Sequence, residues 1–282
     1  MITGLHHTVL VAPDLDGAIA TYSALLGRQP DWISAPREDG AATALFVVDH
    51  TALEILAPVG EGPTGDRLRD MIATDGPGLK SIAFAVENMD RWHTLLTRRG
   101  LAPTDIAARE VAGADGFGKQ AWRSCRIPDE NTAGIKTFFI EEDSRIAAKP
   151  VADDCVHTLD HFVIATPNTD RTLAHYGARL GLDLRLDRAH PEWGAHFLFF
   201  KTGGLIFEIV QRLKEDTDLS ANDQIFGLTW TVRDIEAAHA RLSGLGLNVS
   251  EIRKGRKPGS TVFTVREATF NVPTLFISHS PR

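Results

Sequence analysis

The chain carries one pattern twice. The segment 5–14 returns 154 positions later with its apolar pattern intact, so that His7 becomes His161. Glu54 and Glu208 are also 154 positions apart, and in each copy the Glu follows the His by 47 residues. Self-similarity at a fixed period indicates a duplicated architecture. Because His and Glu are both metal ligands and proton-transfer groups, the repeat also indicates metal binding or proton transfer as the chemistry.

Composition narrows the class of protein. A length of 282 residues suits two domains of about 140 residues each. The net charge of −7 argues against general affinity for nucleic acid. Two cysteines without a Cys-x-x-Cys pair suggest a reducing compartment and no thiolate zinc site. The first residues run straight into a strand pattern and no apolar run approaches the roughly 18 residues of a membrane span, so we expect a cytoplasmic protein without a signal segment or membrane partners.

Periodicity divides each half again into two units. Apolar residues at helical spacing, each run stopped by a glycine, predict helices at 15–26, 89–99, 170–180 and 235–245. Short apolar runs between turn residues predict strands at 7–12, 44–48, 52–56, 81–86, 120–127, 136–140, 162–165, 195–200, 205–210, 228–232, 261–265 and 274–278. The stretch 58–65 is interpreted as a connector and 147–154 as the linker between the halves.

The order of these elements predicts an α+β fold of four βαβββ modules in tandem. The module bounds are 1–66, 76–146, 155–215 and 222–282, which gives an N-terminal domain at 1–146 and a C-terminal domain at 155–282. One such module leaves a sheet face bare, so we expect modules to pair into two curved mixed β-sheet cups with helices outside. Since side chains alternate along a strand, Glu54 and Glu208 should face the hollow of a cup, and His6 should point away from His7.

This pattern resembles the vicinal oxygen chelate superfamily, which includes glyoxalase I, bleomycin-resistance proteins and extradiol dioxygenases. The resemblance covers nearly the whole chain as paired βαβββ modules. The third module looks most like glyoxalase-like domains, through the strand that begins at His161, the loop His190–Gly194 and the strand Leu205–Val210. The superfamily hosts lyases, isomerases, oxygenases and metal-free binding proteins, so the resemblance implies the fold more strongly than the reaction.

In the metal enzymes of this superfamily, each module can offer one ligand on its first strand and one on its last. The resemblance places first-strand ligand positions at His7, Ser81, His161 and Gly227, and last-strand positions at Glu54, Glu141, Glu208 and Ser278. A divalent ion, Mn²⁺, Fe²⁺, Ni²⁺ or Zn²⁺, suits a set of one His and two Glu. Ser81 and Gly227 stand where extradiol dioxygenases have their second His, so ring-cleaving oxygenase chemistry is disfavoured.

The pairing of modules stays open at this point. If the first and second modules pair, the cup holds His7, Glu54 and Glu141. If the second and third pair, it holds His161, Glu208 and Glu141. A pairing of the third with the fourth leaves His161 and Glu208 alone, which is too few ligands for tight binding. The cofactor prediction is therefore one divalent metal or none.

Two loops are candidates for the rim of a cup. The first is His190–Gly194, in which Trp193 could wall the mouth and His190 could act as acid or base. The second is the basic stretch 253–258, which could hold a carboxylate or phosphate, although such a run is more often a solvated hairpin loop. The glycine-rich stretch 113–119 is not a phosphate loop, because no strand leads through it into a helix, although a lid is conceivable. The predicted substrate-binding residues are Trp193, His196, Phe199 and Trp230, with Phe197 beside them.

Two functional hypotheses follow. In the first, a metal held by the His and Glu ligands chelates a small oxo- or hydroxy-acid, and Glu208 or His190 moves a proton, which makes the protein an isomerase or lyase. In the second, the cups are metal-free and hold an aromatic or hydrophobic small molecule, as bleomycin-resistance proteins do. The expected partner is a small molecule in either case, and the protein is expected to be a monomer or homodimer.

Overall fold

The computed structural model describes residues 1–213 and 217–280. The predicted module end at 215 and the chain end at 282 lie outside the described residues, and the predicted domain boundaries stay a prediction. The first half contains β1 (Ile2–Val11), α1 (Leu15–Leu26), β2 (Trp32–Ile33), β3 (Ala41–Val48), β4 (Thr51–Pro58), α2 (Pro63–Asp75), β5 (Gly78–Val86), α3 (Met89–Arg98), β6 (Ala107–Val111), β7 (Gln120–Arg126), the short 3₁₀ turn η1 (Asp129–Asn131) and β8 (Lys136–Glu141).

Among the residues that the structure describes, the second half repeats this order without a counterpart of α2. It contains β9 (Thr158–Ala165), α4 (Thr169–Thr172), the π-helix η2 (Leu173–Arg179), β10 (Asp183–His190), the 3₁₀ turn η3 (Pro191–Trp193), β11 (Ala195–Thr202), β12 (Leu205–Arg212), β13 (Gln224–Thr231), α5 (Ile235–Gly244), β14 (Arg253–Lys254), β15 (Ser260–Val265) and β16 (Thr274–His279). The helix expected at 170–180 is thus divided between α4 and η2. No helix among the described residues is long and apolar enough to cross a membrane.

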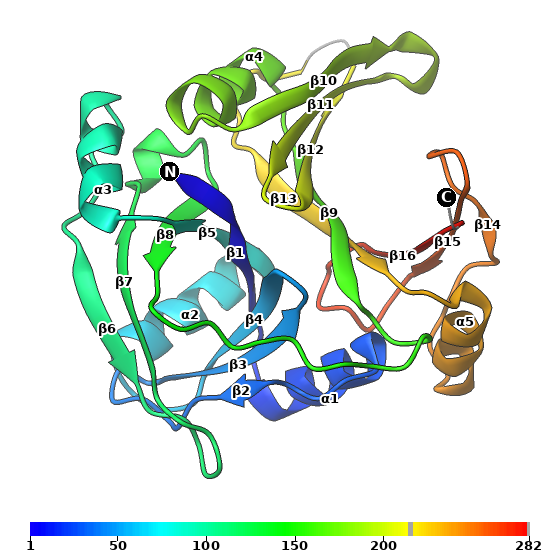
Figure 1. Ribbon diagram of the computed structural model, residues 1–282, viewed down its shortest axis with the longest axis horizontal. Helices are drawn as coiled ribbons and strands as arrows, with labels where there is room; N and C mark the ends of the chain where they lie inside the picture. The colour runs from blue at the N-terminus through cyan, green and yellow to red at the C-terminus, as the bar shows by residue number, and fades with distance from the viewer. Residues whose placement is uncertain (214–216, 281–282) are drawn as a thin grey trace.

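Each half builds one curved, eight-stranded mixed sheet (Figure 1). The strand orders are β2-β3-β4-β1-β5-β8-β7-β6 and β10-β11-β12-β9-β13-β16-β15-β14. The first strands of the two modules in a half, β1 with β5 and β9 with β13, pair antiparallel at the centre. The first module therefore pairs with the second and the third with the fourth, and the alternative pairing of the second with the third is wrong. The α+β fold of paired modules is confirmed.

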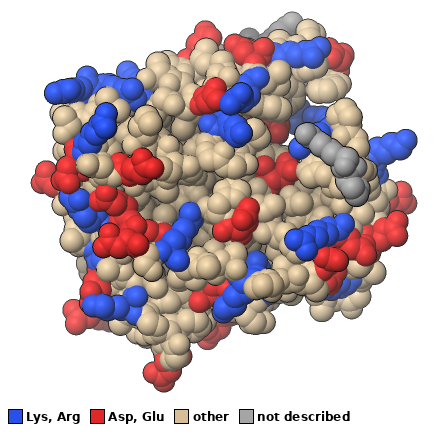
Figure 2. Space-filling view, in the orientation of Figure 1, with Lys and Arg blue, Asp and Glu red and all other residues tan. Residues whose placement is uncertain are grey.

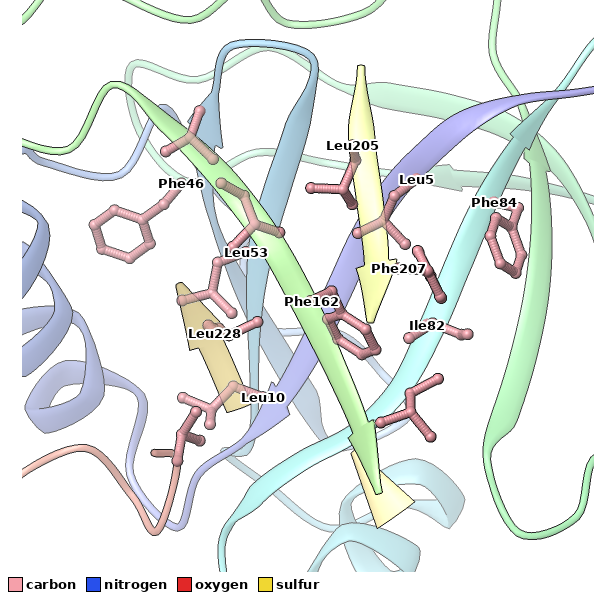
Figure 3. Packing of buried hydrophobic residues seen from close by; sticks show 14 of the residues in the cluster. Leu5, Leu10, Phe46, Leu53, Ile82, Phe84, Phe162, Leu205, Phe207 and Leu228 are labelled. Carbon is pink, nitrogen blue, oxygen red and sulfur yellow. The ribbon is translucent and has the colours of Figure 1, made fainter. Parts of the chain in front are cut away.

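The two sheets share one hydrophobic core. Leu53 and Ile55 are fully buried on the core side of β4, as their alternation with Glu54 predicts. Phe84 of β5 stacks on Phe207 of β12 with ring centroids 5.4 Å apart, so the sheets contact each other directly (Figure 3). Helices α1, α3 and α5 contribute their buried residues to the same core. The opposite, concave face of each sheet, which we call the first cup and the second cup, therefore points away from this core.

Helix α2 is absent from the expected elements and is the main difference between the halves. Its Leu68, Met71 and Ile72 pack on Val9 and Val11, which alternate with His7 on the concave face of β1. The signal was present in the sequence, because these three residues have helical spacing and Pro63 occupies a first-turn position. Helix α2 thus covers part of the first cup.

The other missed elements are the edge strands β2, β6, β10 and β14. Nearly every residue of β10 is exposed, and no residue of β6 or β14 is buried. Such strands lack the alternation that marks a half-buried strand. Acidic and basic side chains are interspersed over the face seen in Figure 2, and neither sign dominates it.

Candidate functional site

A β-bulge shapes both sites. In β1, Leu5 and His7 face consecutive residues of β5, so His6 is an extra residue in the strand. In β9, Leu159 and His161 face consecutive residues of β13, so Asp160 is the extra residue. A bulge interrupts alternation and turns neighbouring side chains toward one side. The expectation that His6 points away from His7 is therefore wrong, and Asp160 likewise lies beside His161.

In the first cup the His–Glu pair is closed. His7 Nε2 lies 2.9 Å from Glu54 Oε2, and Thr43 donates a 3.3 Å hydrogen bond to the same carboxylate. On its other side, His7 Nδ1 lies 2.7 Å from His6 Nδ1, and His6 Nε2 lies 2.9 Å from Glu142 Oε1. Burial lowers the pKa of His6 to about 4, against the opposing effect of Glu142, so this ring is neutral near pH 7. Both nitrogens of His7 are therefore occupied within the protein.

In the second cup the equivalent pair is open. His161 Nε2 lies 3.6 Å from Glu208 Oε2, beyond hydrogen-bond distance, and contacts Thr229 Oγ1 at 2.8 Å. His161 Nδ1 lies 2.9 Å from Asp160 Oδ1, and the other oxygen of Asp160 lies 2.5 Å from His279 Nε2. An ionised Asp160 accepts the Nδ1 proton, so we assign the neutral ring the tautomer whose Nε2 is an acceptor facing the cup.

The surroundings shift the pKa values of Glu54 and Glu208 in opposite directions. Burial opposes ionisation of Glu54, but His7, Arg37 and Thr43 together hold its pKa below the ordinary value. Burial raises the pKa of Glu208, and the nearby charges of His161 and Arg256 offset this only in part. The pKa of Asp160 is far below its usual range, because hydrogen bonds from His161 and His279 outweigh the cost of burial. The second cup thus contains two different carboxyl groups. Glu208 favours its protonated form, and Asp160 stays ionised behind the imidazole of His161.

The structure corrects the role of Glu141. The last-strand equivalent of Glu54 is Phe138, because Phe138 pairs with Ala83 as Glu54 pairs with Val9. Glu141 lies three residues further on and faces the helix side of β8. There it accepts a 3.0 Å hydrogen bond from the Met89 amide at the start of α3 and forms a 3.0 Å ion pair with Arg123. It does not join His7 and Glu54, so the predicted set of one His and two Glu is wrong.

The remaining donors do not fit a resident metal ion. Across residues 1–213 and 217–280, no group of three or more His, Cys, Asp or Glu side chains lies close enough to hold one. In the second cup the first-strand position of the fourth module is Gly227, where a Cβ would lie 2.5 Å from the Pro273 carbonyl oxygen. This close approach of backbone leaves no room for a ligand side chain. His161 and Glu208 alone fall short of the three protein ligands typical of catalytic metal sites.

Aromatic residues line one wall of the second cup. Trp193 and His190 stack with ring centroids 4.2 Å apart, and each contacts Phe197 edge-on at about 6 Å. Phe197 in turn contacts Phe199, which pairs across the strands with Glu208. These residues form a row from the β10–β11 turn to Glu208, which we call the aromatic row. The row contains Trp193, His190 and Phe199, whose predicted roles in binding or acid–base chemistry stay predictions, and no contact among the described residues joins His190 to Glu208.

Two predicted binding residues face the wrong way. His196 lies on the other face of β11, where its ring contacts Asp187 Oδ1 at 2.6 Å and Thr169 Oγ1 at 3.3 Å. Trp230 is fully buried in the core, because the cup face of β13 belongs to its neighbour Thr229. Neither side chain is placed to contact a ligand in the second cup. The sequence analysis missed Asp160, Thr229 and His279; the one available signal was the place of Asp160 directly before a repeated His.

The two sheets also close differently. In the first, Ser34 next to β2 bridges Gly113 in the β6–β7 loop, and the Trp32 indole donates a 2.8 Å hydrogen bond to the Gly118 carbonyl. The glycine-rich stretch 113–119 therefore joins the two sheet edges. In the second, the edge turns contact through Arg256, whose guanidinium lies 4.9 Å from the Trp193 ring centroid. The edges of the first sheet are thus joined by backbone hydrogen bonds, whereas the edges of the second sheet meet through a contact between side chains.

The fold, the module pairing and the duplicated His–Glu positions define the vicinal oxygen chelate superfamily. A family model described as a glyoxalase-like domain matches residues 5–155, and one described as the glyoxalase/bleomycin resistance protein/dioxygenase superfamily matches residues 160–263. The chain therefore belongs to the glyoxalase-like domain family of this superfamily.

Solved structures of similar architecture cover nearly the whole chain. A variant of 4-hydroxymandelate synthase from Streptomyces coelicolor aligns with a TM-score of 0.70 at 12% identity, over 99% of this chain and 94% of that one. The Mn(II)-bound glyoxalase from Novosphingobium aromaticivorans aligns with a TM-score of 0.63 at 13% identity, over 98% of this chain and 82% of that one. At these identities the likeness concerns the fold.

One curated relative matches part of the chain. An ethylmalonyl-CoA/methylmalonyl-CoA epimerase from Cereibacter sphaeroides is 37% identical over 65 residues, which is 22% of this chain. The match spans 46% of the length of that relative.

Proposed function

We propose that the second cup catalyses proton transfer on a small oxo- or hydroxy-acid, as an isomerase or lyase, without a resident metal ion. The observation that carries this proposal is the open His161–Glu208 pair at 3.6 Å, set against the closed His7–Glu54 pair at 2.9 Å. An acid and a base must both reach the substrate, and only in the second cup are the two groups not hydrogen-bonded to each other, so that each can turn to the substrate.

His161 and Glu208 take opposite roles because their protonation states differ: His161 acts as the base and Glu208 as the acid. Once the Thr229 hydroxyl turns away from it, His161 Nε2 takes a proton from the carbon next to the carbonyl, and the electron pair of the broken C–H bond moves toward the carbonyl oxygen. Asp160 stabilises the imidazolium that forms, as a carboxylate behind a catalytic His does. Glu208, whose raised pKa favours the protonated form, delivers its proton to that oxygen and gives an enol. Return of the two protons, with that on carbon going to a different face or atom, completes an isomerisation.

The comparisons support this reaction class at a coarse level. The partial similarity to an epimerase is consistent with an isomerase, but it covers 22% of this chain, so the substrate of that relative is not transferred. A metal-dependent version of the reaction is disfavoured by the donor set, because, in the described part of this half, His161 and Glu208 are the only cup-facing ligand types at the family's ligand positions.

Metal-free binding without turnover is the second candidate. The aromatic row, which ends at the exposed Trp193, favours it, since such a wall suits a planar ligand whether or not the ligand reacts. The buried Glu208 has no use in a purely apolar binding site, and this favours catalysis.

The test is deuterium incorporation from D₂O into a panel of small 2-oxo and 2-hydroxy acids, followed by proton NMR. The wild-type protein should exchange at least one of them, before and after treatment with a chelator. Glu208→Gln should slow exchange by about 10²–10⁴-fold, whereas the matched Glu54→Gln variant should keep the wild-type rate. Exchange that requires an added divalent ion would overturn the metal-free proposal, and binding of panel members without exchange would favour the second candidate.

A further inference from the structure

The mouth of the second cup carries an unpaired cation on an exposed aromatic stack. Arg256 lies in the β14–β15 turn, and its guanidinium sits over Trp193 at 4.9 Å from the ring centroid. Trp193 is 45% exposed and is backed by His190 at an interplanar angle of 15°. With the described residues Arg256 forms no ion pair, so the guanidinium fork keeps its N–H donors available.

A second cation of this turn, Lys257, lies close to the acid–base residues of the second cup. Lys257 Nζ lies 4.0 Å from Asp160 Oδ2, directly behind His161. Burial raises the pKa of Glu208, and Arg256 is one of the charges that oppose this rise. The β14–β15 turn therefore places two cations of one hairpin beside the same acid–base group.

The aromatic row connects these two places. It runs from Trp193, next to Arg256, through Phe197 and Phe199 to the strand position opposite Glu208. A planar ligand that lies along the row can therefore have one end at the guanidinium and the other at the catalytic pair. Arg suits a carboxylate at such a place, because its fork matches the two oxygens while its flat face stays on the indole.

We propose that Arg256, supported by Lys257 and by the Trp193–His190 stack, forms a carboxylate-binding site that selects planar, unsaturated acids for the second cup. This inference deepens the proposed function, on which it rests for the identity of the reacting end. It gives the basic stretch 253–258 a role as a recognition loop, with Arg256 as the specificity residue.

The test uses benzoate as the planar carboxylate, with benzyl alcohol and inorganic phosphate as comparison ligands, in calorimetric or NMR titrations of the full chain. Benzoate should bind, benzyl alcohol should bind at least tenfold more weakly, and phosphate should not compete. Arg256→Gln should weaken benzoate binding by about tenfold or more. Arg253→Gln, which removes the same charge from an exposed position in the same hairpin, should leave the affinity unchanged.

Three outcomes would overturn the proposal: no benzoate binding, equal binding of benzyl alcohol, or equal losses in the Arg256 and Arg253 variants. Glu208→Gln separates the two levels of the argument, since it should bind benzoate normally while losing exchange. If the panel acids exchange but benzoate does not bind, the recognition site fails and the proposed function stands. If benzoate binds through Arg256 but no acid exchanges, the proposed function fails instead.

Discussion

The two halves keep the same strands, the same bulge and the same His–Glu spacing, yet they differ in how the pair is used. In the first cup, His6, Glu142 and Thr43 saturate the pair, and the sheet edges are joined by backbone. In the second, the bulge residue is Asp160, which leaves His161 Nε2 toward the cup, and the edges meet through Arg256. Duplicated ligands therefore do not imply duplicated sites, because the neighbours decide whether an imidazole is a structural group or a reactive one.

A large effect is expected from the helix that covers only the first cup. Leu68 of α2 is 4% exposed and packs on Val9 and Val11. Leu68→Ala should lower the free energy of unfolding by about 2–5 kcal/mol, because the substitution leaves a cavity. Urea denaturation measures this loss. Deuterium exchange per folded molecule should not change, and a parallel loss of exchange would show that the first cup contributes to the reaction.

Acid should destabilise both halves through buried histidines. Burial lowers the pKa of His6 in the first half and of His175 in the second to about 4, from an ordinary value near 6.5. The unfolded chain therefore binds these protons more tightly, so their contribution to stability is complete above pH 6.5 and is lost as the pH falls toward 4. Each should remove about 3 kcal/mol over this window.

Urea unfolding at several pH values measures this loss. Replacing either histidine with Gln should remove about half of the dependence. A dependence that disappears with one substitution alone would mean that the two halves are not alike in this respect.

Substitutions of the two bulge residues, Asp160 and His6, give the sharpest comparison of reaction rates between the two cups. Asp160→Asn should slow proton transfer by about 10–100-fold, because His161 loses the carboxylate that fixes its tautomer and stabilises its charged form. His6→Asn, at the same place in the first half, should leave the rate unchanged. Steady-state rates of deuterium exchange measure both. Equal effects of the two substitutions would contradict the assignment of the reaction to the second cup.

The smallest effect is expected at the closure of the second sheet. Trp193→Ala should lower the free energy of unfolding by less than about 1 kcal/mol, since an exposed cation–π contact is worth about 0.5–1 kcal/mol. Trp32→Ala in the first sheet should cost about 3–5 kcal/mol, because Trp32 is buried and its indole bonds across the closed edges. Thermal or urea unfolding compares them, and similar losses would mean that the second closure is as firm as the first.

Much of the fold could be predicted because its core follows simple periodicity. Leu53, Glu54 and Ile55 alternate as a half-buried strand should, and the repeat placed the same alternation around Glu208. The edge strands could not be predicted, because β10 is exposed on both faces. Helix α2 was within reach, since its apolar residues have helical spacing, but its glycine- and proline-rich start favoured a connector.

The site was harder to predict because it depends on register. Counting along β8 favoured Glu141, but the paired strands place Phe138 at the ligand position and Glu141 on the other face. The bulges at His6 and Asp160 depend on pairing with β5 and β13, which no local pattern reports. His279 lies 119 residues after Asp160 and reaches it only because β16 joins the same sheet.

The most direct test is a matched pair of substitutions, His161→Gln and His7→Gln, each measured by deuterium exchange with an acid that the wild-type protein turns over. His161→Gln should lose about 10²–10⁴-fold in rate while staying folded, and His7→Gln should lose stability but keep the rate per folded molecule. The reverse result, or equal loss of rate in both variants, would contradict the assignment of the reaction to the second cup.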